Sequence, residues 1–246
     1  MLTELFFKNL KSVLDKIEQT QKESISQCAE VIVESLCNNG IWHLLDTGHM
    51  LMYEGVGRAG GMMAVRPVRI EVEVSNPTRL RQIPGKKNVY LDEIEGFPKL
   101  VLGKANITAG DVLMIGSVSG INILPVEMAI KACEMGVKTI ALTSVEYSSF
   151  LKSRHPSGKK LFEVCNYVLD NCGEVGDALV DVKELGNKIC PSSGIAASYL
   201  MWALQADVVE KMLALGKKPS IYLSNHVENA TVINNETWMK YEQLGY

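Results

Sequence analysis

The sequence predicts an α/β fold in which a parallel β-sheet is covered by helices on both faces. From residue 111 onward, short apolar runs alternate with longer amphipathic stretches, as strands and helices do in consecutive βαβ units. The apolar runs also lack regular polar alternation, which is typical of parallel strands that are buried on both faces. The connections between the strands are therefore expected to be right-handed.

The N-terminal segment 1–38 is predicted to be helical, with one long helix or two consecutive helices over residues 3–38. Apolar residues recur in steps of three and four from Leu2 to Ile17, and the pattern resumes at Ile25 after a polar stretch. Gly40 is suited to end the helical region. About half of this surface could pack on the core, and the rest could pack on a partner subunit.

The next part of the chain is less regular. Residues 41–49 are predicted to form a short buried strand that enters a glycine loop. Residues 50–63 look helical until their glycines, and residues 64–75 have strand character. Residues 75–100 contain three prolines and are predicted to be an irregular excursion with a short helix around residues 89–96.

Regular alternation begins at residue 111. The predicted strands are 111–117, 137–144 and 167–172. The predicted helices are 124–136, 158–165 and a long one at 191–216, which follows a polar loop. We expect a single domain over residues 1–246, with the core at 39–225 and a C-terminal tail at 226–246.

Composition excludes several classes of function. The net charge is −3 and the basic residues are not clustered, so no nucleic-acid surface is expected. The chain lacks a signal peptide pattern and any stretch of about 18 apolar residues, so no membrane span is expected. None of the six cysteines forms a CxxC pair, which favours free thiols in a reducing cytoplasm.

Familiar cofactor motifs are missing from the sequence. No GxGxxG follows the first predicted strand, and no GxxxxGK[ST] occurs. No histidine or cysteine pair has the spacing of metal ligands. We therefore predict neither a cofactor nor a metal ion.

The stretch "GSVSGIN" at 116–122 lies between a predicted strand and a predicted helix. Ser117 and Ser119 supply hydroxyl donors, Gly120 lets the backbone approach a ligand, and Asn122 can cap the helix. A helix N-terminus with such residues can bind a phosphate. The same residues are equally suited to an ordinary capped turn, so spacing alone leaves both interpretations open.

The segment "DVLMIGSVSGINILPVEMAIKACEMGVKTIALTS" resembles the centre of the SIS (sugar isomerase) domain family. The hallmark of that family is a strand, an S-x-S-G loop, a helix and a second strand ending in T-S. The upstream "DTGH…RAGG" and the downstream "HPSGKKLFEVCNYVLDNCGEVGDALV" are similar to a bacterial, phosphoheptose-isomerase-like branch. The resemblance implies a flavodoxin-like three-layer αβα sandwich with a five-stranded parallel sheet, and binding of a sugar phosphate.

The resemblance also implies roles for individual residues. Four residues of the S-x-S-G-x-N loop would hold the phosphate, and Ser144 would complete the pocket; the four are Ser117, Ser119, Gly120 and Asn122. The residues that would line the sugar side are Thr47, Gly48 and His49. Further candidates for sugar binding are Arg58, Ser192 and Ser193. Two departures stand out, because the family usually reads G-T-G-x-S where this chain has Asp46 and Met50. Val118 and Ile121 likewise stand where polar or basic residues are expected.

Aldose–ketose isomerisation requires a base that moves a proton between adjacent carbons. Glu54 and His49 are the candidate catalytic residues. Arg58 lies four residues after Glu54 and could steady its carboxylate, although a surface ion pair is the alternative. His43 is expected to be a core residue, whereas His155 and His226 are given no firm role.

We therefore predict a sugar-phosphate isomerase that acts by acid–base proton transfer. The alternatives are a non-catalytic sensor of sugar phosphates, a sugar-phosphate lyase or etherase, and an interaction protein that has lost its ligand. The last long helix carries no histidine, which argues against simple transfer of phosphoheptose isomerase activity. A homodimer that involves the N-terminal helices is also expected.

Overall fold

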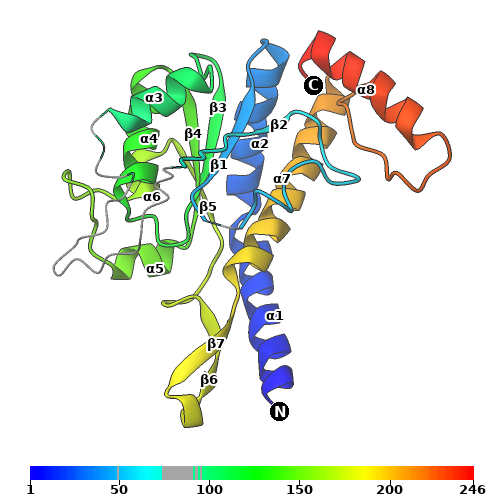
Figure 1. The fold of residues 1–246 in the computed structure, drawn as a ribbon. Coiled ribbons are helices and arrows are strands. Elements are labelled where there is room, and N and C mark those ends of the chain that lie inside the picture. The colour runs from blue at the N-terminus through cyan, green and yellow to red at the C-terminus, as the bar shows by residue number, and fades with distance from the viewer. Residues whose placement is uncertain (49, 74–90, 92–93, 95) are drawn as a thin grey trace, which may run out of the picture.

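The computed structural model describes residues 1–48, 50–73, 91, 94 and 96–246. Its centre is a parallel sheet with the strand order β2-β1-β3-β4-β5 (Figure 1). The strands are β1 (Trp42–Asp46), β2 (Val65–Pro67), β3 (Val112–Gly116), β4 (Lys138–Thr143) and β5 (Tyr167–Asp170). The predicted five-stranded parallel sheet is confirmed.

Helices cover both faces of the sheet and complete three layers (Figure 1). One layer contains α1 (Leu2–Thr20), α2 (Lys22–Cys37) and α7 (Ser193–Ala214). The other contains α3 (Phe97–Lys104), α4 (Ile123–Glu134) and α6 (Leu161–Val164). The short helix α5 (Val145–Phe150) follows β4.

The core lies on both sides of the central strands. In β3, Val112 and Met114 pack towards α2 and α7, whereas Leu113 and Ile115 pack towards α3 and α4, and all four are fully buried. Each such side chain contributes roughly 2 kcal/mol through burial. The unbroken apolar run therefore arises because both faces of the strand are covered, as the sequence predicted.

The N-terminal helical segment forms two helices that meet at Gln21. The side-chain oxygen of Gln21 accepts a hydrogen bond from the backbone N–H of Asp170 at 3.0 Å. This contact fixes the junction of α1 and α2 to β5. Figure 1 shows the N-terminal part of α1 extending beyond the sheet, alongside strands β6 and β7.

Several segments differ from the sequence-based predictions, among them α3 and α5, which lie in stretches predicted to be irregular or loop. Residues 50–63 form turns and bends instead of a helix, because this stretch is rich in glycine and Gly57 and Gly60 have φ angles of 67° and 84°. The predicted polar loop before α7 contains an antiparallel hairpin. The hairpin consists of β6 (Ala178–Val182), the 3₁₀ turn η2 (Lys183–Leu185) and β7 (Asn187–Pro191).

The C-terminal residues, predicted as a tail, form helix α8 (Ala230–Leu244). The helix is attached to the sheet edge through Arg66 of β2, whose guanidinium lies 5.2 Å from the ring centre of Trp238 and 5.7 Å from that of Tyr241. Cation–π contacts of this kind contribute about 0.5–2 kcal/mol each. The predicted helix at 89–96 lies mostly outside the described residues.

Candidate functional site

The carboxyl ends of β1 and β3 border a cavity of about 300 Å³. This cavity, called the cleft below, is where ligands bind in open α/β sheets. The loop after β1 and the loop after β3 form opposite walls, and the hairpin region closes a third side. Its lining residues are Asp46, Thr47, Gly48, Met50, Ser117, Val118, Ser119, Asn122, Tyr147, Gly176 and Asp177.

The loop 117–122 is held in place through its carbonyl oxygens. The carbonyl of Val118 accepts a hydrogen bond from the N–H of Ser144 at 3.0 Å, and that of Gly120 accepts one from the N–H of Leu161 at 2.8 Å. The carbonyl of Ile121 accepts a hydrogen bond from the N–H of Arg154, after α5, at 2.9 Å. The loop is therefore anchored to neighbouring elements by its acceptors.

The backbone donors of the same loop differ in their partners, since the N–H of Ser117 donates to the carbonyl of Leu142 at 3.0 Å. Among the described residues, none accepts a hydrogen bond from the backbone N–H groups of residues 119–122. These groups precede α4, whose N-terminus carries partial positive charge. Ser117, which is buried, and Ser119 line the cleft beside them. Anchored acceptors and available donors make this loop a suitable cradle for an anion.

The loop 46–48 forms the opposite wall. Asp46, one of the departures from the family pattern, is 9% exposed, and its carboxylate accepts hydrogen bonds from the N–H groups of Gly48 (3.0 Å) and Leu51 (2.6 Å). Thr47 donates through both its N–H and its hydroxyl to the carbonyl of Gly116. Asp46 therefore replaces a glycine with a carboxylate that orders the loop and also faces the cleft.

Met50, the second departure in this loop, is 3% exposed and packs into the core beneath the cleft. It puts an apolar group where the family pattern has a serine. A second cavity, of about 400 Å³, lies on the other side of loop 46–48 and shares Asp46, Thr47 and Gly48 with the cleft.

Ser192 and Ser193 lie at the start of α7, and both are fully buried. Their backbone N–H groups and their hydroxyls donate to the carboxylate of Asp177, at distances of 2.6–3.3 Å. Asp177 lines the cleft, so this cluster connects the cleft wall to the last long helix. Sugar binding by the two serines stays a prediction, because the described residues that line the cleft do not include them.

Ser144 is the N-cap of α5 and is fully buried. Its hydroxyl donates to the carbonyl of Gly173 at 2.6 Å and accepts from the N–H of Tyr147 at 3.0 Å. It lies directly behind the loop 117–122, which its N–H group anchors. Direct phosphate binding by Ser144 stays a prediction that would require the hydroxyl to exchange these partners.

Glu54 and Arg58 form an ion pair of 3.4 Å in the turns after β1. Both side chains are about half exposed, so solvent screens the pair. Neither is among the described residues that line the cleft. His49 lies outside the described residues. The catalytic roles of Glu54 and His49 and the sugar-binding role of Arg58 therefore stay predictions.

The remaining histidines lie away from the cleft lining. His43 is buried and its Nε2 lies 3.1 Å from the Asp111 carboxylate, which confirms it as a core residue. Burial lowers the pKa of His43, although the hydrogen bond to Asp111 opposes this. His155 connects Glu127 and Ser157, at 2.7 Å each. His226 is exposed near the start of α8.

Sequence reasoning missed three residues at or beside the cleft. Asp177 and Tyr147 line the cleft from segments that the sequence places far from the S-x-S-G loop. Arg154 lies beside that loop, with its guanidinium 3.3 Å from the Asn122 side-chain oxygen. The stretch "RHPSG", which begins with Arg154, offered a signal for this residue. It precedes α6, whose first residue, Leu161, donates its N–H to the carbonyl of Gly120.

Metal or thiol chemistry finds no support in the described part of the chain. No group of three or more metal-ligating side chains occurs there. The six cysteines are free, and burial raises the pKa of Cys28 and Cys165 to about 12. Those two thiols are therefore protonated at neutral pH. No helix in the described ranges is long and apolar enough to cross a membrane.

A model of the SIS domain matches residues 5–144, which is more than half of the chain and includes both glycine loops. The chain belongs to the SIS domain family. The chain is 33% identical over 238 residues to a UPF0309 protein of Halalkalibacterium halodurans, and the match covers 96% of each of the two chains. It is 34% identical to a UPF0309 protein of Caldanaerobacter subterraneus, covering 98% of each.

Solved structures share the fold of this SIS domain at low sequence identity. A phosphoheptose isomerase of Francisella tularensis superposes with a TM-score of 0.52 at 14% identity, covering 82% of this chain and 94% of that one. The phosphoheptose isomerase of Neisseria gonorrhoeae gives a TM-score of 0.50 at 18% identity, with the same coverage. These likenesses concern the fold alone.

Proposed function

We propose that this SIS domain binds a sugar phosphate in the cleft, with the phosphate on loop 117–122 and the sugar towards Thr47 and Gly48. The observation that carries the proposal is the row of backbone N–H groups at residues 119–122, at the N-terminus of α4. No described residue accepts a hydrogen bond from these groups, so they are available to an anion. Family membership supports this ligand class, as do the fold neighbours named phosphoheptose isomerases.

The proposed reaction is isomerisation between an aldose phosphate and a ketose phosphate by proton transfer. Glu54 and His49 are the proposed acid–base residues. Glu54 would reach the sugar only by leaving its ion pair with Arg58. Asp46 is a further candidate, because its carboxylate already lines the cleft. It accepts two hydrogen bonds from loop amides, and an ionised carboxylate can accept more than two.

The alternative is a protein that binds a sugar phosphate without turnover. One observation favours it: the carboxylates that line the cleft from described residues, Asp46 and Asp177, are both engaged in ordering the chain around them. In that case the cradle holds the phosphate, and neither of the two described carboxylates moves a proton.

Thermal unfolding with aldose and ketose phosphates, next to the matching free sugars, tests binding. A ligand of the folded state at a hundredfold excess over Kd stabilises it by about 2.7 kcal/mol. We expect a raised Tm with at least one sugar phosphate and none with free sugars. Ser119→Asp should abolish the shift by adding negative charge to the cradle, whereas Ser149→Asp, on exposed α5, should keep it.

Turnover is then measured with the stabilising compound in D₂O. Isomerisation by proton transfer incorporates deuterium next to the carbonyl carbon, which NMR detects. Deuterium incorporation supports the isomerase. Binding without deuterium incorporation supports the sensor, and a Tm that no sugar phosphate raises contradicts both proposals.

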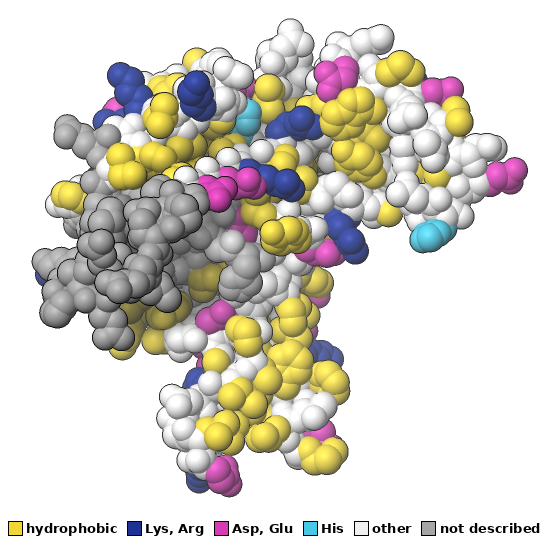
Figure 2. All heavy atoms as spheres, viewed as in Figure 1, with side chains coloured by type: hydrophobic (Ala, Val, Ile, Leu, Met, Phe, Trp, Pro, Cys, Tyr) yellow, Lys and Arg dark blue, Asp and Glu magenta, His cyan; other side chains and the backbone are white. Residues whose placement is uncertain are grey.

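We also propose that the protein is a homodimer whose contact includes α1. Figure 2 shows hydrophobic side chains gathered over the extension formed by α1, α7 and the β6–β7 hairpin. Large apolar residues there are substantially exposed, and grouped exposed apolar side chains favour association. They include Leu5, Phe7, Leu185 and Ile195. Light scattering at micromolar concentration should give twice the mass of the chain, 27.1 kDa; a monomer would contradict the proposal.

A further inference from the structure

A separate cavity of about 610 Å³ lies between α3 and the extended segment that follows β2. Ile41, which precedes β1, and His43, near the amino end of β1, line this cavity, whereas the cleft lies at the carboxyl ends of the strands. None of the described residues that line the cleft lines this cavity. We call it the edge cavity, because β2 is the edge strand of the sheet.

A buried histidine provides a polar group in the edge cavity. His43 is 5% exposed, and its Nε2 lies 3.1 Å from the carboxylate of Asp111. That carboxylate also accepts the N–H groups of Ile41 and Thr108, so it is a fixed acceptor and His43 donates to it through Nε2–H. In the neutral ring Nδ1 then carries a lone pair. No described residue bonds to Nδ1, which leaves an acceptor for a ligand.

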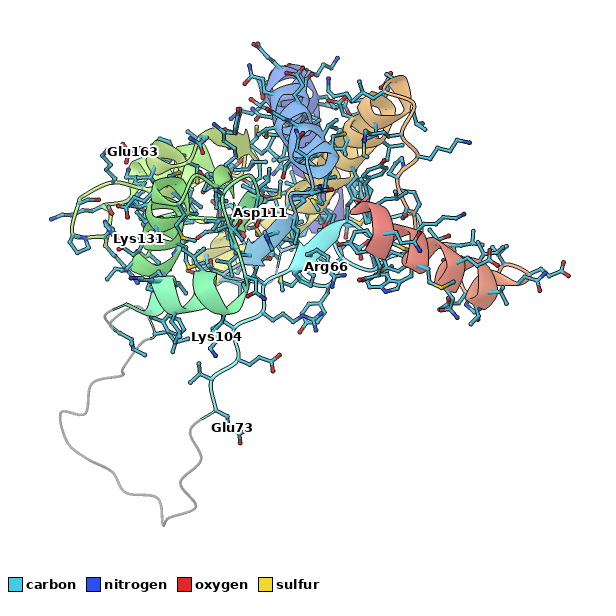
Figure 3. All side chains as sticks on the ribbon, turned by 90° about the horizontal axis from the view of Figure 1, so that it is seen from above. Arg66, Glu73, Lys104, Asp111, Lys131 and Glu163 are labelled. Carbon is cyan, nitrogen blue, oxygen red and sulfur yellow. The ribbon has the colours of Figure 1, made fainter. Side chains whose placement is uncertain are left out.

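Positive charge surrounds this acceptor. Among the described residues, Arg66, Arg69 and Lys104 line the edge cavity together with one carboxylate, that of Glu71. In the described ranges, none of the three cations takes part in an ion pair. Figure 3 shows Arg66 on β2 and Lys104 on α3, with Asp111 further inside the fold. The lining therefore favours an anion.

The guanidinium of Arg66 is already oriented. The guanidinium carbon lies over the rings of Trp238 and Tyr241, at 5.2 and 5.7 Å from their centres. A guanidinium carries five N–H donors, and it can bind a planar anion such as a carboxylate or a sulfonate through two of them. The contact with α8 therefore restrains the side chain of Arg66 before a ligand binds in the edge cavity.

The rest of the lining is apolar. Phe97 and Val101 of α3 are buried at the edge cavity, and Val68 is buried on the opposite wall. Leu100, also in the lining, is 56% exposed. A ligand that occupied this space would cover apolar surface as well as meet the cations.

We propose that the edge cavity is a second ligand site, which takes a small organic anion with an apolar or aromatic body and one O–H or N–H donor. The anionic group meets Arg66 and Lys104, the apolar body lies on Phe97, Leu100 and Val101, and the donor bonds to His43 Nδ1. The edge cavity and the cleft share no described lining residue, so the proposal does not rest on sugar phosphate binding or on any reaction in the cleft.

The probe for this site is 8-anilinonaphthalene-1-sulfonate, which combines an aromatic body, a sulfonate and an N–H donor. Titration of the full chain should show one saturable fluorescent site. Lys104→Glu should weaken binding at least fivefold by reversing one lining charge. Lys99→Glu makes the same charge change on the exposed face of α3, outside the lining, and should leave the affinity unchanged.

A second readout places the probe at His43. In the long-range ¹H–¹⁵N spectrum of ¹⁵N-histidine-labelled protein, the probe should shift His43 Nδ1, while His155 and His226 stay in place. Equal affinities for Lys104→Glu and Lys99→Glu, or an unmoved His43 signal at saturation, would overturn the proposal. Either result would assign the probe to exposed apolar surface elsewhere.

Discussion

Asp177→Ala is expected to lower the free energy of unfolding by about 3 kcal/mol, because hydrogen bonds to a charged acceptor are strong and their loss leaves buried donors unpaired. The carboxylate accepts from the N–H groups and the hydroxyls of Ser192 and Ser193, both fully buried. Asp177 also has a φ of 64°, which alanine adopts at a further cost of about 1 kcal/mol. Chemical denaturation of the full chain measures the effect.

Two matched variants separate these causes. Asp177→Asn retains a side chain that tolerates positive φ but replaces one acceptor oxygen with an NH₂ donor, so an intermediate loss is expected. Asp181→Ala makes the same substitution at an exposed position of β6 and should change the stability by less than about 0.5 kcal/mol. If Asp177→Ala were no worse than Asp181→Ala, the proposed anchoring of α7 would be wrong.

Gly120→Ala is expected to destabilise the protein by about 2–3 kcal/mol and to remove sugar phosphate binding. The residue has a φ of 58°, which a non-glycine residue adopts at a cost of about 1–2 kcal/mol. An added Cβ would lie 3.0 Å from Thr143 Oγ1 and 3.2 Å from Leu161 Cβ. The loop must move to relieve these contacts, which displaces the N–H groups from their positions in the cradle.

Gly158→Ala is the control for Gly120→Ala. Gly158 has a φ of 73° but an added Cβ there meets no heavy atom within 4 Å. The Gly158→Ala protein should therefore show only the cost of the positive φ, about 1–2 kcal/mol, with ligand affinity retained. Thermal unfolding with and without sugar phosphate compares the two variants. A Gly120→Ala protein that binds with unchanged affinity would contradict the assignment of the cradle.

The layered fold could be predicted because its signals are local. The apolar run at Val112–Gly116, the S-x-S-G loop and the amphipathic α4 follow one another within a short stretch. Residues 50–63 were mispredicted since their apolar spacing suggested a helix, while the glycines favoured turns. The β6–β7 hairpin and α8 were not predicted, because their stability depends on residues distant in the sequence. The cation–π contact between Arg66 and Trp238 of α8 is an example.

The candidate site was predicted in part. Ser117, Ser119, Asn122, Thr47 and Gly48 line one cleft because the carboxyl ends of neighbouring parallel strands meet at one edge of the sheet. The partners of Ser144 and the serines of α7 were not predictable, since Gly173 and Asp177 come from a later segment that folds back. The role of Asp46 in ordering its loop was also not predictable, because it depends on hydrogen bonds from the N–H groups of Gly48 and Leu51.

The central claim is that the N–H groups of residues 119–122 hold the phosphate of a sugar phosphate. The most direct measurement is the backbone ¹H–¹⁵N spectrum of the labelled protein during titration with the sugar phosphate that raises its Tm. The account predicts that the largest downfield shifts fall on the amides of Ser119 to Asn122, that inorganic phosphate moves the same signals, and that the free sugar leaves them in place. Unmoved amides at saturation, with the largest shifts elsewhere, would contradict it.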